Sequence, residues 1–158
     1  MRQLIFSLFL FCSLNAFADD VYKLYGNPRF DFSVQYPVGI LTPGQEPENG
    51  DGLIFYSKDG KAQLRVTGIF NSTESSVDKE FEHEKDDAAT KGVVTYKASK
   101  GNWYVVSGIE AGKAFYVRRT LVGDVFKTFS FTYPENEAAL YEPILKRMLA
   151  SYRTKPSR

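Results

Sequence analysis

The sequence predicts an α+β domain in which two helices pack on an antiparallel sheet of about six to seven strands. Four apolar runs between Val93 and Pro134 are separated by short turns that contain glycine. Two other β-like runs flank an Asp59-Gly60 pair. One stretch with helical spacing follows this hairpin, and a second one closes the chain. Strands joined directly by tight turns favour antiparallel pairing, because parallel strands need long crossover connections.

The first eighteen residues have the pattern of a cleaved Sec-type signal peptide. A positive Arg2 precedes an apolar stretch from Leu4 to Leu14, and Ala16-Phe17-Ala18 is a small-x-small cleavage site. We therefore expect cleavage after Ala18, a single domain over residues 19–158, and a periplasmic location. After cleavage we expect no membrane span.

Cysteine usage agrees with that compartment. The one cysteine, Cys12, lies inside the signal peptide, so the mature chain has no disulfide and no thiolate metal ligand. The residue before Cys12 is Phe11, whereas a lipidation site needs a small residue there. A secreted domain without disulfides fits a bacterial periplasm better than a disulfide-rich extracellular module.

The N-terminal part reads as strands. In the run from Phe30 to Tyr36 every second residue is apolar, which indicates a strand with one buried face that Pro37 ends. Residues 39–52 contain prolines and acids and read as a loop. The runs 53–57 and 62–70 flank Lys58-Asp59-Gly60-Lys61, and Asp-Gly between two β-like runs is a strong hairpin signal.

The pattern then becomes helical. Ser75 and Asp78 resemble a capping box, and a strongly acidic helix is expected to about Thr90, with Gly92 at its end. The closing helical stretch covers residues 135–152, where Pro143 either kinks the helix or marks its start. We expect the tail, residues 154–158, to be disordered.

The predicted meander has two distinguishable faces. On its third strand, Phe115, Val117 and Arg119 share one face, while Tyr116 and Arg118 lie on the other. Neither face is plainly polar, which predicts a sheet that is covered at least in part on both sides.

The run from Phe30 to Pro37, the Asp59-Gly60 hairpin and the ending from Tyr141 to Tyr152 resemble the Mog1/PsbP-like fold. The wider group includes small periplasmic or lipid-anchored bacterial proteins of the DcrB kind. The resemblance covers about Tyr25 to Tyr152 and implies an antiparallel sheet sandwiched by helices. Members of the fold mostly act as binding or accessory modules, so it implies such a role and carries over no catalytic residue.

Charge and motifs argue against several function classes. The formal net charge is +1, which lacks the basic excess of nucleic-acid binders. The only histidine, His83, lies among acids on the predicted helix, far from the packed arrangement that a Ser-His-Asp site requires. Glu46, Glu48 and Asp51 lack the spacing of a calcium loop. We therefore expect no catalytic residues, no metal and no cofactor.

Two sets of residues are candidates for binding. Trp103, Tyr116 and Arg118 combine the residue types that are enriched at protein-binding hot spots, although such aromatics can equally belong to the core. Glu80 and Glu84 lie four residues apart on the acidic helix, where they either meet a basic partner or only face solvent.

Three functions remain open at this point. The first is a non-catalytic protein-binding or accessory module of the periplasm or envelope, with an inhibitor or immunity-type protein as one form. The second is a carrier of a small apolar or aromatic ligand held between sheet and helix. The third is a hydrolase that uses His83.

Overall fold

The computed structural model describes residues 21–155, so the predicted signal peptide and the last three residues lie outside the described part. Within that part the chain forms two antiparallel sheets and two α-helices, which confirms the predicted α+β class. The larger sheet has seven strands in the order β3-β4-β5-β9-β8-β7-β6, and the smaller has three in the order β1-β2-β10. Among the described residues, no helix is long and apolar enough to cross a membrane.

The predicted meander forms one continuous part of the large sheet. It consists of β6 (Val93–Lys100), β7 (Trp103–Glu110), β8 (Lys113–Val122) and β9 (Val125–Pro134). The strands are joined by two-residue turns, and Gly101 and Gly112 take the positive φ angles of 60° and 75° that such turns favour. This region is therefore predicted correctly.

The other three strands of the large sheet come from the first half of the chain. It contains β3 (Leu41–Pro43), β4 (Gly52–Ser57) and β5 (Gln63–Phe70). The Asp59-Gly60 turn joins β4 to β5 as predicted, and β5 pairs with β9. The stretch 39–52, expected as a loop, includes the short strand β3, because Leu41 is buried in the core and pairs with Ser57.

The small sheet differs most from expectation. β1 (Tyr22–Asn27) and β2 (Phe32–Pro37) form a hairpin, and β10 (Arg153–Thr154) pairs with β2. The expected disordered tail is therefore wrong for Thr154 and Lys155. The Lys155 amide donates to the Asp31 carbonyl, and the ammonium group of the buried Lys127 donates to the Lys155 carbonyl.

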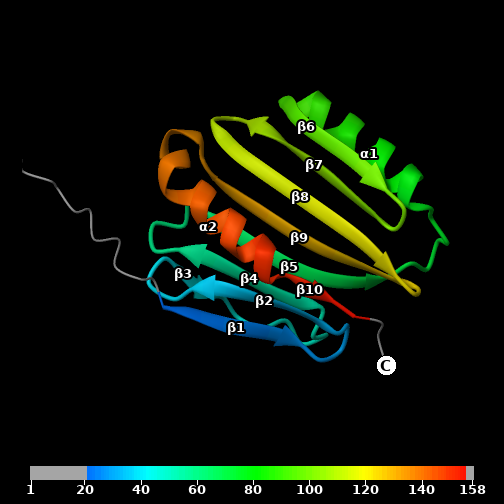
Figure 1. Ribbon diagram of the computed structural model, residues 1–158, viewed down its shortest axis with the longest axis horizontal. Coiled ribbons are helices and arrows are strands. Elements are labelled where there is room, and N and C mark those ends of the chain that lie inside the picture. The colour runs from blue at the N-terminus through cyan, green and yellow to red at the C-terminus, as the bar shows by residue number, and fades with distance from the viewer. Residues whose placement is uncertain (1–20, 156–158) are drawn as a thin grey trace, which may run out of the picture.

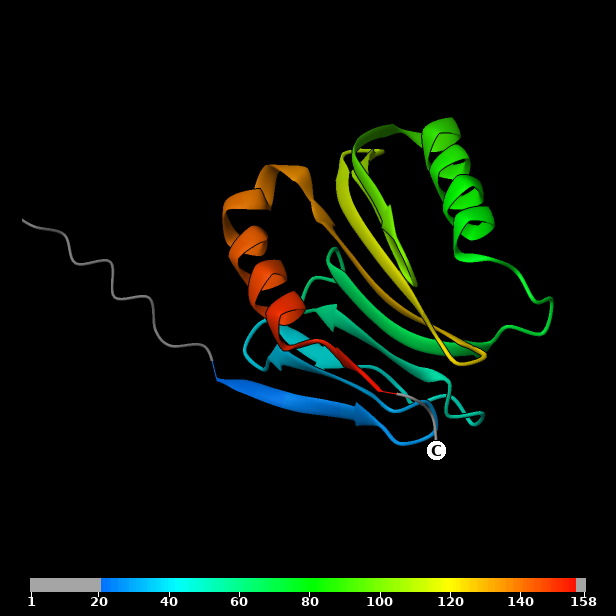
Figure 2. The same cartoon turned by 45° about the vertical axis from the view of Figure 1, so that its right-hand side comes forward.

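The two helices lie on opposite sides of the large sheet (Figure 1, Figure 2). Helix α1 (Val77–Lys91) packs on β6 and β7, and helix α2 (Ala138–Ser151) packs on β2 and β9. The N-cap of α1 is Ser76 rather than Ser75, since the Ser76 hydroxyl accepts from the Lys79 amide at 3.2 Å. A short 3₁₀ turn over Glu135–Glu137 precedes α2.

Pro143 lies inside α2. Of the two alternatives for Pro143, a helix start near this residue is wrong, because α2 begins at Ala138. Pro143 sits near the start of α2 and is exposed to solvent. A proline there removes one backbone hydrogen bond, and buried neighbours such as Tyr141 and Ile144 hold the turn against the sheet.

Two hydrophobic cores follow from this arrangement. The larger core lies between the small sheet, α2 and the strands β4, β5 and β9, where aromatic rings such as Phe55, Phe129 and Phe131 are fully buried. The smaller core lies under α1, around Val77, Tyr104 and Phe126. Each face of the large sheet is thus covered over only part of its width.

Candidate binding surface

Helix α1 covers one side of the part of the large sheet that β6, β7 and β8 form. Antiparallel partners place their side chains on the same face, so strand register identifies the residues on the other side. We call this side the Trp103 face. It consists of Tyr96, Ala98 and Lys100 on β6, Trp103, Val105, Ser107 and Ile109 on β7, and Ala114, Tyr116, Arg118 and Thr120 on β8.

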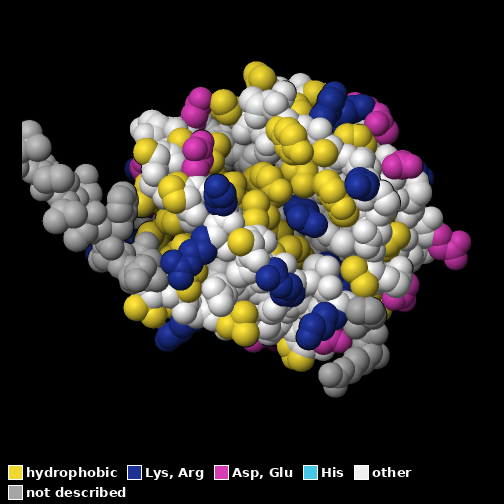
Figure 3. Space-filling view, in the orientation of Figure 1, with side chains coloured by type: hydrophobic (Ala, Val, Ile, Leu, Met, Phe, Trp, Pro, Cys, Tyr) yellow, Lys and Arg dark blue, Asp and Glu magenta, His cyan; other side chains and the backbone are white. Residues whose placement is uncertain are grey.

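The Trp103 face is apolar and aromatic, with cations nearby. Figure 3 shows hydrophobic side chains gathered over the exposed strands beside α2, with Lys and Arg side chains around them. Tyr96 is 56% exposed, whereas Trp103, Ile109 and Tyr116 are half-buried. Contiguous exposed apolar surface of this kind is typical of interaction sites.

An open groove runs between the Trp103 face and α2. Its volume is about 440 Å³, and on the sheet side it is lined by Ile109, Ala114 and Tyr116. Helix α2 contributes Leu145 and Glu142 to the opposite wall. The groove therefore has an apolar floor with a carboxylate on its rim.

Arg118 and Trp103 form the central pair of this surface. The guanidinium carbon of Arg118 lies 5.1 Å from the centre of the Trp103 ring. No acidic side chain among the described residues forms an ion pair with Arg118, and its Nε atom is buried without a hydrogen-bond partner. Charged guanidinium groups normally find an acceptor, so this one has unused hydrogen-bonding capacity.

Two tyrosines pack close to Arg118. Burial raises the pKa of Tyr116 above its usual value, and the positive charge of Arg118 opposes that rise. Burial also raises the pKa of Tyr152, whose hydroxyl is buried without a partner in the described chain. Both phenols therefore stay neutral at physiological pH and leave the Arg118 charge uncompensated.

The two glutamates proposed for binding lie on the opposite side of the sheet. Glu80 accepts a charged hydrogen bond of 2.6 Å from Arg119, whose guanidinium also lies 4.6 Å from the centre of the Phe126 ring. Glu84 accepts a 3.4 Å hydrogen bond from the Tyr104 hydroxyl. Both carboxylates thus hold α1 onto the sheet, and the structure does not bring them together with Trp103, Tyr116 and Arg118.

The Tyr104 phenol is strongly perturbed under α1. Burial is the main cause that raises its pKa to about 12, and the carboxylate of Glu84 adds to the rise. Arg119 opposes it. This cluster has the composition of a buried structural contact.

His83 is exposed on α1, and its imidazole forms no hydrogen bond with the described residues. In the described chain, no group of three or more histidine, cysteine, aspartate or glutamate side chains could hold a metal ion.

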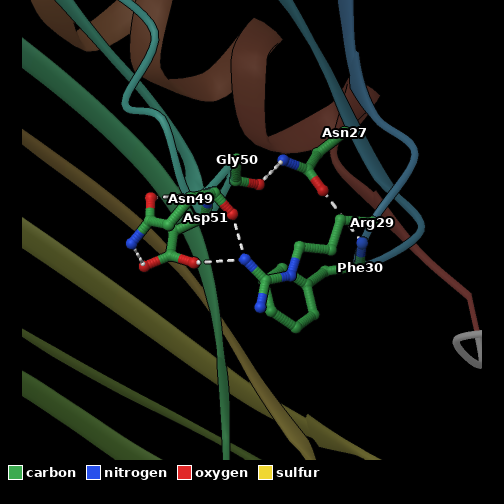
Figure 4. A network of polar contacts seen from close by, with 6 residues as sticks. All are labelled: Asn27, Arg29, Phe30, Asn49, Gly50 and Asp51. Atoms are coloured by element: carbon green, nitrogen blue, oxygen red, sulfur yellow. Dashed lines mark hydrogen bonds and ion pairs between the residues drawn. The ribbon is translucent and has the colours of Figure 1, made fainter.

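Asp51 from the acidic loop takes part in a polar network that links this loop to the β1–β2 turn (Figure 4). Arg29 donates to the Asp51 carboxylate at 3.2 Å and to the Asn49 carbonyl. The amide of Asn27 donates to the Gly50 carbonyl at 2.9 Å. The network fixes two surface loops against each other.

Sequence reasoning missed Tyr96, Lys100 and Ile109 as parts of the exposed surface. Their residue types carry no signal by themselves, because Tyr and Ile in a strand are commonly buried and a lysine is commonly exposed on any surface. Only the strand order and the position of α1 show that these side chains lie on an uncovered face.

No protein-family model matches the chain, and no curated protein matches its sequence. Among solved structures, the chain is similar to the cyanobacterial PsbP (CyanoP) of Synechocystis sp. PCC 6803, with a TM-score of 0.62 and 10% sequence identity. The match covers 90% of this chain and 98% of that chain.

A second solved structure, of a protein from Bacteroides thetaiotaomicron VPI-5482, matches with a TM-score of 0.50 and 17% identity. This match covers 84% of the chain and 48% of that protein. At these identities the similarity concerns the fold alone. The chain has a PsbP/Mog1-like fold, as the resemblance in the sequence implies.

Proposed function

We propose that this chain is a non-catalytic binding module of the periplasm and that the Trp103 face holds a partner protein. The observation that carries the proposal is the Trp103–Arg118 stack, which lies on an uncovered sheet face and has no acidic partner in the described chain. A few hot-spot residues carry most of the binding energy at protein interfaces, and tryptophan, tyrosine and arginine are enriched among them. An accessory, inhibitory or immunity-type role agrees with such a surface on a small domain.

Two further features support this proposal. The residues 1–18 have the pattern of a periplasmic signal peptide, so the partner is expected in the periplasm or envelope. The exposed position of His83 gives no support to a hydrolase, because a catalytic histidine must lie beside its nucleophile.

A crosslinking pull-down tests the proposal. Tagged mature chain, residues 19–158, is crosslinked in the periplasm of its native host, and captured proteins are identified by mass spectrometry. Wild type is compared with Trp103→Ala, with Arg118→Glu, and with Glu82→Gln, a matched control on the exposed side of α1.

We expect one stoichiometric partner that both Trp103-face variants lose and that the Glu82 variant keeps. Circular dichroism and urea unfolding of each variant check that the fold is intact. A partner that all three variants capture equally would show that another surface binds it and would overturn the assignment.

A second function, a carrier of a small apolar or aromatic ligand, is favoured by the groove between the Trp103 face and α2. Its apolar floor at Ile109 and Tyr116 and its size are suited to one small molecule. Native mass spectrometry of chain purified from the periplasm tests this alternative. A bound molecule that disappears in Leu145→Trp, which fills the groove, would support it, and a ligand-free wild-type chain would count against it.

A further inference from the structure

The strand β6 forms one edge of the large sheet. It is eight residues long, and in the described part of the chain it pairs with β7 alone. Among residues 21–155, no backbone hydrogen bond joins its outer edge to another segment. Such an edge presents unpaired N–H and C=O groups to which another extended chain can add.

Apolar side chains stand along this edge. Val93 is 65% exposed and Tyr96 is 56% exposed, and both lie on the same side of the sheet as Trp103. Helix α1 packs against the opposite side and so does not cover them. A strand added to β6 would therefore extend the Trp103 face by one further row of side chains.

Two lysines give the edge its charge. Lys100 pairs in register with Trp103 and lies on the Trp103 face, whereas Lys97 pairs with Val106 and lies on the α1 side. Both are exposed, and neither forms an ion pair with the described residues. Lysines on an edge strand disfavour a second copy of the same edge and favour a neighbour that carries carboxylates.

We propose that β6 pairs with an acidic extended segment of the partner protein, which adds as an antiparallel strand. This inference rests on the proposed function, since it names the chemistry of the partner that the Trp103 face holds. Antiparallel addition continues the pairing that the rest of the sheet already uses.

The register of β6 specifies the sequence pattern of that segment. A bulge interrupts pairing between Val94 and Tyr96, so the regular part of the edge runs from Tyr96 to Lys100. In an antiparallel neighbour, apolar residues would face Tyr96 and Ala98, and acids would face Lys97 and Lys100. Read from its N-terminus, the segment has the pattern acid, any residue, apolar, acid, apolar.

Peptide display tests this pattern directly. Three libraries with random flanks are selected on the full mature chain. One carries the acidic pattern, one has lysine in place of both acids, and one has the acidic pattern in reverse order. The best peptides are then titrated by fluorescence anisotropy, and hydrogen exchange of the β6 amides is measured with and without peptide.

We expect the acidic forward pattern to be enriched and its peptides to slow exchange of the amides over Tyr96–Lys100. Affinity should fall tenfold or more in the double variant Lys97→Glu/Lys100→Glu, which should instead select the lysine library. Glu82→Gln serves as the matched surface control and should leave affinity unchanged. Enrichment of the lysine or reversed library on wild type, no enrichment of the acidic one, or unchanged β6 exchange with bound peptide would each overturn the inference.

This experiment is separate from the test of the proposed function. If capture of a partner depends on Trp103 but the acidic peptides fail, the Trp103 face remains the recognition surface and only the strand addition is excluded. If the peptides bind β6 but Trp103→Ala loses no partner, the proposed function fails. The inference that β6 binds acidic segments is then still supported.

Discussion

The guanidinium of Arg118 stacks on the indole of Trp103 across the neighbouring strands β8 and β7, with 5.1 Å between the guanidinium carbon and the ring centre. The next residue, Arg119, points to the other face and is neutralised by Glu80. Two adjacent arginines thus have different surroundings, one with a carboxylate and one without. The stack itself contributes about 0.5–1 kcal/mol at an exposed site.

Arg118→Ala is therefore expected to weaken partner binding more than it weakens the fold. We expect a tenfold or greater loss of affinity by calorimetric titration with the captured partner, because interface arginines are frequent hot spots. The free energy of unfolding in urea should change by less than about 1 kcal/mol. Arg118→Lys keeps the charge and loses the planar stack, so its affinity for the partner should lie between those of wild type and Arg118→Ala. Equal binding by wild type and Arg118→Ala would contradict the prediction.

The Glu80–Arg119 pair is expected to hold α1 on the sheet. Its side chains are 25% and 22% exposed, and Arg119 also covers Phe126. Glu80→Gln should lower the free energy of unfolding by about 1–3 kcal/mol, the range for a hydrogen bond to a charged group. The more exposed Glu82–Lys85 pair is the control, and Glu82→Gln should cost under about 1 kcal/mol. Equal costs in urea unfolding would show that the Glu80 contact is not a stabilising link.

The meander could be predicted from the sequence because its signals are local. Each turn contains glycine, and Gly101 and Gly112 have the positive φ angles that the turns favour. The alternation on β8 also places Tyr116 and Arg118 on one face, as the structure has them. Turn chemistry and the two-residue strand period do not depend on distant parts of the chain.

The small sheet and the composition of the site could not be predicted in this way. The strand β10 has two residues and pairs with β2, more than a hundred positions earlier in the sequence, so no local pattern marks it. The sequence likewise does not indicate which side of the sheet α1 covers. In the structure, Val77 and Phe81 pack on the Tyr104 side of the sheet. This placement of α1 separates Glu80 and Glu84 from Trp103.

The raised pKa of Tyr104 predicts a pH dependence of stability. In the folded chain this phenol ionises at a pKa of about 12, whereas in the unfolded chain it ionises near 10. Between these values the unfolded state loses a proton that the folded state keeps, so the contribution is fully present below about pH 10 and declines above it. Between pH 8 and 12 the free energy of unfolding in urea should therefore fall less steeply in Tyr104→Phe than in wild type. Parallel pH curves for the two proteins would show that Tyr104 does not cause the loss of stability.

Any side chain at Gly68 on β5 is expected to destabilise the fold, because Phe30 from the turn before β2 packs directly on this glycine. A Cβ atom at this position would lie 2.5 Å from Cγ of Phe30, a ring that is 1% exposed and stacks edge-on with Phe70. Gly68→Ala should therefore lower the free energy of unfolding by about 1–3 kcal/mol, as overpacking of a core does. The smaller side chain in Phe30→Leu should restore part of this loss in the double variant, although Phe30→Leu alone is destabilising. Strictly additive losses in urea unfolding would mean that the two residues do not interact, and the small sheet would then be held to β5 by other contacts.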